Sequence, residues 1–292
     1  MATPFISLLE PPNDLSSYNR HLPPSQQTCT SLPKVFLDAM EVREAVYVKE
    51  QGVPLEFEQD DDDNRAVHWV IYASVNQTIE PEIRDPSTNA LIRPRRSESR
   101  SMPIGTLRLI PFPHPPHPRK GGIYVNDKLV NAGDPSPGSI PQDLSIIQPL
   151  TQTEKHRLSA TPSFIPYALD PPTTYHDGQE VYVKLGRLAV LKDFRGHGIA
   201  TQLIHAAFEW MMRHKNGFNP SATAEITTVS VSLGGGGPSN DVPKWKGLFC
   251  CHAQESAVKI WEKHGFQVDP AMGRWLEEGI PHVGMFYRAQ LR

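Results

Sequence analysis

Hydrophobic residues recur along the chain at two different spacings. Alternation, or a short run of β-branched and aliphatic residues, predicts strands at 5–9, 66–73, 104–110, 123–125, 181–190, 226–233, 248–252, 266–268 and 283–287. A helical spacing of apolar residues predicts amphipathic helices at 35–47, 199–212 and 254–264. Strands and helices therefore alternate in a way that is typical of an α/β protein.

Three stretches interrupt this pattern, and we expect them to be insertions within one domain that spans 1–292. Residues 75–102 have the composition of a loop or a disordered segment, and the basic run that starts at Arg93 favours a solvated loop over a nuclear-import or nucleic-acid-binding patch. Residues 111–176 form a Pro-rich insertion, in which Pro113-His-Pro-Pro-His-Pro favours a rigid, exposed polyproline II spacer over a metal clip of two histidines. Residues 233–245 predict a Gly-rich loop.

Charge and cysteine content limit the classes of function. The 29 Lys and Arg residues against 32 Asp and Glu residues leave a formal charge of -3, so we expect no general attraction to nucleic acid or to an anionic membrane. Three cysteines, two of them the neighbours Cys250 and Cys251, do not suggest a disulfide framework and favour a reducing compartment. The sequence has neither a signal-peptide pattern nor a long apolar run, so we expect a cytoplasmic protein, with the nucleus also open.

The stretch from Val181 to Leu203 joins a strand to a helix through a glycine-containing turn. Arg195-Gly-His-Gly-Ile-Ala lies where the turn enters the helix. The first N–H groups of a helix have no acceptor within the helix, and they lie at the positive end of its dipole, so they bind anions well. Glycines at positions 196 and 198 would let the backbone approach a phosphate without steric hindrance. The turn therefore predicts a binding site for a pyrophosphate.

Two other phosphate-binding patterns fit this turn less well. A dinucleotide-binding fingerprint requires a third glycine where this chain has Thr201, followed by a βαβ unit with an acidic residue. A Walker A loop requires Gly-Lys-Ser/Thr at its end, and that is absent here. A strand-turn-helix without a ligand is the remaining alternative.

The turn resembles the acetyl-CoA signature Arg/Gln-x-x-Gly-x-Gly/Ala of the GCN5-related N-acetyltransferases (GNAT). Ala257-Val-Lys-Ile-Trp-Glu-Lys-His-Gly-Phe is similar to a second pattern of that family. Val42 to Pro54 resembles the first helix, and Glu277-Glu-Gly-Ile-Pro-His-Val-Gly-Met the ending, of a small bacterial and fungal subset. The resemblance implies a single GNAT-like α/β domain, with a mixed, mainly antiparallel sheet flanked by helices and with long loop insertions.

The resemblance also implies a set of residues that bind acetyl-CoA as the co-substrate. A bulge in the central strand would place residues 188–190 against the pantetheine arm and the thioester, with the N–H of Val190 as the oxyanion donor. Gln254 lies where the family often has an Asn that contacts CoA. The implied cofactor-binding residues are Leu188, Ala189, Val190, Arg195, Gly196, His197, Gly198, Ile199, Ala200, Thr201 and Gln254.

For catalytic groups other than Val190, the chain departs from the family at two positions. Trp261 stands where many relatives have the Tyr that protonates the leaving thiolate, and an indole N–H does not ionise usefully. Lys184 lies near the position of a catalytic Glu and cannot serve as a base.

Four groups remain as candidates for the base, and they are Glu58, Asp60, His68 and His282. Each of the two histidines could equally be a packed, hydrogen-bonded residue. Since His68, His252 and His282 have no zinc-ligand spacing, no metal is expected.

The sequence thus predicts an acetyl-CoA-dependent N-acetyltransferase that acts on the primary amine of a small molecule, with an amino-sugar phosphate such as glucosamine 6-phosphate as the first candidate. A protein or peptide N-acetyltransferase is an alternative, because Asp60 to Asp63 could line an acidic groove. A non-catalytic CoA-binding or interaction module is another. A homodimer is also left open.

Overall fold

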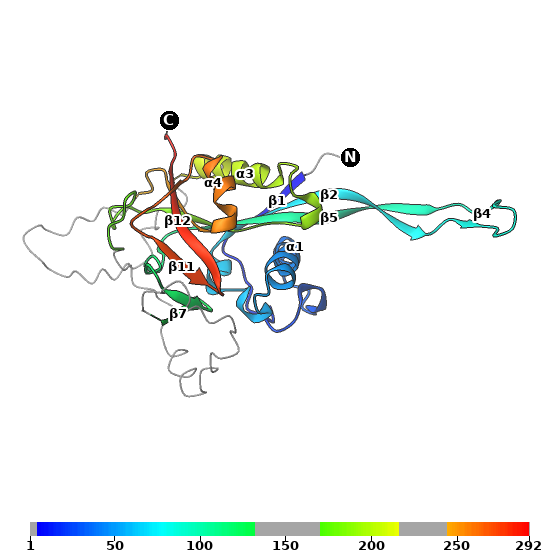
Figure 1. Cartoon of the computed structure of the whole chain (residues 1–292), viewed down its shortest axis with the longest axis horizontal. Helices are drawn as coiled ribbons and strands as arrows, with labels where there is room; N and C mark the ends of the chain where they lie inside the picture. The colour runs from blue at the N-terminus through cyan, green and yellow to red at the C-terminus, as the bar shows by residue number, and fades with distance from the viewer. Residues whose placement is uncertain (1–4, 132–169, 216–243, 292) are drawn as a thin grey trace, which may run out of the picture. The chain divides into compact units, whose positions relative to one another are not determined.

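The computed structural model (Figure 1) describes residues 5–131, 170–215 and 244–291. The chain forms two compact units. Unit 1 consists of Met1–Leu109 and Arg187–Ala207, and unit 2 of Ile110–Gly186 and Phe208–Arg292. The strand predicted at 226–233 and most of the predicted Gly-rich loop at 233–245 lie outside the described residues. No helix in the described part of the chain is both long enough and apolar enough to cross a membrane.

Unit 1 is built on the antiparallel strands β1, β2 and β5, together with the C-terminal half of β8. Phe5 of β1 pairs with Tyr72 of β2, and Trp69 of β2 pairs with Leu107 of β5. The elements of this unit are β1 (Phe5–Leu9), η1 (Pro24–Gln26), α1 (Lys34–Arg43), η2 (Glu44–Glu50), η3 (Leu55–Phe57), η4 (Asp61–Asn64), β2 (Val67–Glu80), β3 (Ile83–Arg84), β4 (Leu91–Arg93), β5 (Arg96–Ile110), β8 (Val183–Val190), η6 (Lys192–Phe194) and the first part of α3 (Ile199–Arg213).

Helix α1 forms because its apolar residues recur on one face, and that face is buried in unit 1. Phe36, Ala39 and Met40 are almost completely buried, and Ala39 packs with Val70 of β2. Asp38 is also buried, and it accepts hydrogen bonds from Lys34 Nζ (2.6 Å) and Tyr72 Oη (2.6 Å). The helix predicted at 35–47 is thus confirmed, although its last part is the π-helix η2.

Residues 75–102 were expected to be a loop, and that prediction is wrong. They form the outer parts of β2 and β5, which extend as a long two-stranded ribbon with β3 and β4 at its tip (Figure 1). The turn is made by Asp85, whose carboxylate accepts hydrogen bonds from the N–H groups of Ser87 and Thr88 at 2.8 Å each. Glu80 lies near the guanidinium groups of Arg93 and Arg96. Cross-strand pairing therefore orders a segment whose prolines and charges suggested a loop.

Unit 2 contains the N-terminal half of β8, followed in the strand order by β9, β12, β11, β6 and β7. β8 pairs with β9 in parallel, as β11 does with β6, and the other ladders of the unit are antiparallel. Its elements are β6 (Ile123–Val125), β7 (Lys128–Asn131), β9 (Leu248–Gln254), η7 (Glu255–Ala257), α4 (Val258–Glu262), β10 (Gln267–Val268), β11 (Arg274–Glu277) and β12 (Ile280–Arg288).

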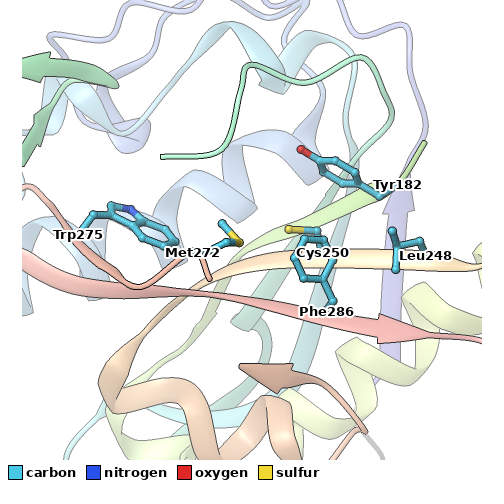
Figure 2. Close-up of a cluster of buried hydrophobic side chains, with 6 residues drawn as sticks. All are labelled: Tyr182, Leu248, Cys250, Met272, Trp275 and Phe286. Carbon is cyan, nitrogen blue, oxygen red and sulfur yellow. The ribbon is translucent and has the colours of Figure 1, made fainter. Parts of the chain in front are cut away.

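The core of unit 2 includes a cluster of Tyr182, Leu248, Cys250, Met272, Trp275 and Phe286 (Figure 2). Gly284 of β12 makes room for it, since a Cβ atom there would lie only 2.0 Å from Met272 Sδ. The strands predicted at 123–125, 248–252 and 283–287 are present, whereas the helix predicted at 254–264 is reduced to η7 and α4.

The proline-histidine tract at 113–118 was expected to be an exposed spacer, and this is also wrong. His114 and His117 are each 7% exposed and stack on the ring of Tyr182, with centroid distances of 4.5 and 5.2 Å. Aromatic packing therefore holds this part of the insertion against the sheet, which the proline content did not reveal. Residues 132–169 of the insertion lie outside the described residues. The α/β fold with a mixed, mainly antiparallel sheet is confirmed.

Candidate functional site

Strand β8 changes its backbone conformation in the middle. Residues Val183 to Leu185 pair in parallel with Phe249 to Cys251, and this ladder ends two residues before Arg187, which has a positive φ of 51°. A residue with a Cβ atom adopts such a conformation at a cost of roughly 1–2 kcal/mol. The predicted irregularity of the central strand is therefore located at Arg187.

A buried network of charged groups holds Arg187 in this conformation. Its guanidinium contacts Glu58 Oε1 at 3.2 Å and Asp60 Oδ2 at 3.0 Å. Arg43 pairs with Glu58 (2.6 Å) and Asp63 (2.8 Å), and Arg108 pairs with Asp60 and Asp63 at 2.6 Å each. Three arginines thus balance three carboxylates, as buried charges require.

Glu58 and Asp60 of this network were predicted base candidates, as was His68, which lies beside Asp63, and their surroundings favour structural roles. Glu58 is 2% exposed and accepts a hydrogen bond from Arg43 Nε. His68 is 1% exposed, and its Nε2 lies 3.0 Å from the carbonyl oxygen of Asp63. Burial lowers the pKa of His68 to about 4, despite the opposing effect of the nearby Asp63 carboxylate. The packed, hydrogen-bonded alternative therefore fits His68 better than a base does.

The residues after Arg187 are fixed by the π-helix η2. Tyr47 donates a hydrogen bond from Oη to the carbonyl oxygen of Leu188 (2.9 Å). Ala189 is 3% exposed and packs with Val42 and Val46. Sequence reasoning missed Tyr47, although π-helical turns often occur at functional sites. Two of the residues predicted to contact the pantetheine arm are therefore firmly positioned.

The turn between β8 and α3 is open where the sequence predicts a pyrophosphate. Gly196 and Gly198 have φ angles of 80° and 75°, and a Cβ atom at either position would have nothing within 4 Å. Helix α3 begins directly afterwards at Ile199, and its first turn includes the hydrogen bond from Gln202 N to Gly198 O (3.1 Å). His197 Nδ1 lies 2.9 Å from the carbonyl oxygen of Arg195. An anion can thus reach the start of the helix without steric hindrance.

Arg195, one of the implied cofactor-binding residues, makes two contacts within the protein. Its Nε donates to the carbonyl oxygen of Val190 (2.9 Å), and its Nη2 pairs with Glu50 Oε2 (2.8 Å). The side chain is 45% exposed. The guanidinium therefore closes the turn back onto the end of β8, and Glu50 offsets part of its charge.

Gly105 allows β8 and the start of α3 to lie close to β5. A Cβ atom at this position would lie 3.0 Å from Ile199 Cγ2, 3.1 Å from Ile71 Cγ2 and 3.2 Å from the carbonyl oxygen of Ala189. The sequence signal was a single glycine within a strand pattern. Leu203, Ile204 and Ala207 of α3 are completely buried, as the helical spacing predicted.

Unit 2 contains the other predicted site residues. Gln254 ends β9 and pairs in register with His282 of β12. His282 Nδ1 lies 2.8 Å from the carbonyl oxygen of Ile280, and its Nε2 lies 3.7 Å from Glu277 Oε2. Since a carbonyl oxygen can only accept, Nδ1 is assigned the proton, and Nε2 carries the lone pair. Glu277 was not singled out in the sequence.

Trp261 is a core residue of unit 2. It is 3% exposed and packs edge-to-face against Phe266, with ring centroids 5.1 Å apart. Its burial confirms the inward face predicted for this helix. A separate cavity of about 410 Å³ is lined by apolar residues such as Val258 and Val283 and by Glu255, and none of the predicted site residues lines it.

Three solved structures illustrate the structural comparison. Escherichia coli ElaA is 14% identical, with 98% of this chain and 100% of that chain covered and a TM-score of 0.41. An acyl-CoA N-acyltransferase from Pseudomonas aeruginosa has 14% identity, the same coverage and a TM-score of 0.40. Arabidopsis thaliana NAA60, solved with acetyl-CoA, has 11% identity, coverage of 98% of both chains and a TM-score of 0.35.

The comparison with protein families finds a match to one part of the chain. No curated protein matches the sequence significantly. Residues 171–268, which include the irregular strand β8, the open turn and α3, match the model of the acetyltransferase (GNAT) domain. This part of the chain is accordingly similar to the acetyltransferase (GNAT) domain, the family that the sequence motifs resemble.

Proposed function

We propose that the protein transfers an acetyl group from acetyl-CoA to the primary amine of a small molecule, with an amino-sugar phosphate such as glucosamine 6-phosphate as the first acceptor to test. The observation that carries this proposal is the open turn at Gly196 and Gly198, which leads from β8 into α3. In the proposed complex the pyrophosphate of the cofactor accepts hydrogen bonds from the N–H groups at the start of α3.

Residues 188–190 are proposed to contact the pantetheine arm and the thioester. Tyr47 already occupies the carbonyl oxygen of Leu188, and Arg195 that of Val190. These contacts hold the peptide planes on either side of the Ala189–Val190 peptide. In the proposed mechanism the N–H of Val190 stabilises the oxyanion that forms when the amine attacks the thioester. Because the peptides on both sides of this donor are held beforehand, we expect it to move little during the reaction.

His282 is the strongest of the base candidates. Glu58 and Asp60 are paired with arginines, and His68 is buried with a lowered pKa. His282 keeps a lone pair on Nε2, and the carboxylate of Glu277 would stabilise the imidazolium that forms when Nε2 takes a proton. Since Trp261 is packed in the core and cannot deliver a proton, we propose that the thiolate leaves as an anion and is protonated by water.

The alternatives are less well supported. A peptide acceptor was suggested by the acidic residues 60–63, but Asp60 and Asp63 are paired with arginines, and Asp62 pairs with Arg65 at 2.7 Å. This segment therefore offers little free negative charge to a basic peptide. A non-catalytic CoA-binding module would have the same open turn, and it would differ from the proposed enzyme only by its lack of turnover.

The decisive test measures thiol release from acetyl-CoA with and without a panel of amines that includes glucosamine 6-phosphate, simple alkylamines and a basic peptide. Release that depends on a small amine supports the proposal. Release only with the peptide would favour the peptide alternative, and CoA binding without release with any amine would favour the non-catalytic module.

The contribution of the turn to CoA binding can be measured by substituting two glycines of similar conformation. Gly198→Val places a branched side chain where the pyrophosphate is proposed to bind, so CoA affinity should fall at least about tenfold, equivalent to about 1.4 kcal/mol. Gly52→Val is the matched control, because Gly52 has a φ of 79° and also has nothing within 4 Å of an added Cβ atom. Both variants should lose stability, but only Gly198→Val should lose CoA affinity in calorimetry. Equal affinities would contradict the proposed cofactor site.

A further inference from the structure

Three polar side chains of unit 2 meet in its interior although they are far apart in the sequence. His117 belongs to the proline-histidine tract, and Asp170 and His176 precede β8 by several residues. The side chains of His117, Asp170 and His176 are 3%, 7% and 2% exposed. Each offers one potential ligand atom to a common point.

The spacing of these atoms matches that of ligands around one metal ion. His117 Nε2 lies 3.3 Å from His176 Nδ1 and 3.5 Å from Asp170 Oδ2, and the last two atoms are 3.9 Å apart. A point equidistant from three atoms with these separations lies about 2.1 Å from each of them. Zinc–imidazole and zinc–carboxylate bonds have lengths of about 2.0–2.2 Å.

The surrounding hydrogen bonds orient two of the three atoms towards that point. His176 Nε2 lies 2.8 Å from the carbonyl oxygen of Glu180 and must donate to it, which leaves the lone pair on Nδ1. Asp170 Oδ1 accepts from the N–H of His117 (2.6 Å), so that Oδ2 remains for the ion, and Tyr182 Oη lies 3.3 Å from Oδ2. Metal-binding histidines and carboxylates usually have such outer partners.

Hydrogen bonding alone satisfies this cluster poorly. The contact between His117 Nε2 and His176 Nδ1 (3.3 Å) is longer than an ordinary hydrogen bond, and the distance to Asp170 Oδ2 (3.5 Å) is longer still. His117 Nδ1 is buried and has no hydrogen-bond partner among the described residues. A cluster of packed histidines would normally have its polar atoms paired.

We propose that His117, Asp170 and His176 bind a divalent transition metal ion of the zinc type, which joins the proline-histidine tract to the segment before β8. Two imidazole nitrogens and one carboxylate oxygen are borderline ligands that suit Zn²⁺ and disfavour Ca²⁺ and Mg²⁺. The ligands are buried and lie on segments separated by 53 and 59 residues, so the bound ion would stabilise the contact between these segments. Sequence spacing did not reveal this set, since its three ligands come from distant parts of the chain.

A second set of atoms shares His117 and provides the main alternative. Nitrogens of His117 and His252 and the sulfur of Cys250 lie within 4.8 Å of one another. Cys250 also belongs to the apolar cluster beside Tyr182 (Figure 2). An ion bound there would depend on Cys250 and not on Asp170 or His176, so variants distinguish the two sets.

The test measures metal content by mass spectrometry in the full-length protein, purified without chelators and without an affinity resin that carries metal. The wild type should contain about one zinc-type ion per chain. His176→Ala and Asp170→Asn should lose it. Cys250→Ser should keep it, and so should the matched control His114→Ala, which removes an imidazole from a residue as buried as His117.

A stability measurement covers the case in which a ligand variant does not fold. After removal of metal from the wild type, Zn²⁺ alone should raise the melting temperature by at least about 5 °C, and Mg²⁺ should not. A wild type with less than about 0.1 ion per chain and no response to Zn²⁺ would overturn the proposal. Loss of the ion in Cys250→Ser with retention in His176→Ala would also overturn it, in favour of the second set. Neither readout depends on acetyl transfer.

Discussion

The positive φ angle of Arg187 leads to a prediction that separates backbone strain from charge pairing. Arg187→Ala and Arg187→Gly both remove the guanidinium that contacts Glu58 and Asp60. The alanine keeps a Cβ atom at a φ of 51°, whereas glycine adopts that conformation without strain. In an ordinary strand position the glycine variant would be the less stable of the two.

The expected magnitudes follow from the geometry. Loss of the guanidinium leaves two buried carboxylates with fewer partners, and because Arg187 is 27% exposed and Arg43 and Arg108 remain, we expect both variants to lose roughly 2–3 kcal/mol. Relief of strain favours glycine by about 1–2 kcal/mol. The greater freedom of glycine in the unfolded chain costs about 0.5–1 kcal/mol. Arg187→Gly should therefore be more stable than Arg187→Ala by about 0.5–1 kcal/mol.

The assay is denaturant unfolding of both variants, followed by tryptophan fluorescence. Lys184 supplies the control pair, because it lies in the regular part of β8 and pairs with Cys250 in the parallel ladder. There, Lys184→Gly should be less stable than Lys184→Ala by about 0.5–1 kcal/mol. If the glycine variant is the less stable one at both positions, Arg187 is not strained, and the charge network does not hold an unfavourable backbone.

Three further predictions concern other parts of the molecule. Arg195→Glu places a carboxylate beside Glu50 and should lower CoA affinity at least about tenfold by calorimetry, whereas unchanged affinity would contradict a role for Arg195 in the turn. The pKa of His68 is lowered from 6.5 to about 4, so its contribution to stability is lost as the pH falls from 6.5 towards 4. Between pH 7 and pH 5 the wild type should therefore lose about 2 kcal/mol more unfolding free energy than His68→Gln does. An equal loss in both proteins would refute this prediction. Trp261→Phe should keep most of the turnover without loss of an alkaline pKa in the rate profile, and an inactive variant with normal folding and CoA affinity would reveal a chemical role for the indole.

The local pattern of the sequence determined the fold class and the main feature of the candidate site. Alternation and helical spacing located most strands and helices, because these periodicities reflect which side of an element is buried. The pair of glycines at 196 and 198 located the open turn, because few other residues adopt its backbone conformation. These features depend on neighbours within a few residues, and so the sequence contains them directly.

Tertiary structure decided which side chains are available for chemistry. Glu58 and Asp60 were plausible bases in the sequence, and only the fold brought Arg43, Arg108 and Arg187 to them. The long ribbon at 75–102 formed because its two halves pair with each other, which composition does not record.

The histidine cluster shows most clearly that the sequence does not reveal contacts between distant residues. His117 lies 59 residues before His176 in the chain, and the two approach each other only because the insertion folds back onto Tyr182. Local sequence patterns do not encode such contacts, because the free energy that forms them comes from burial against residues far along the chain.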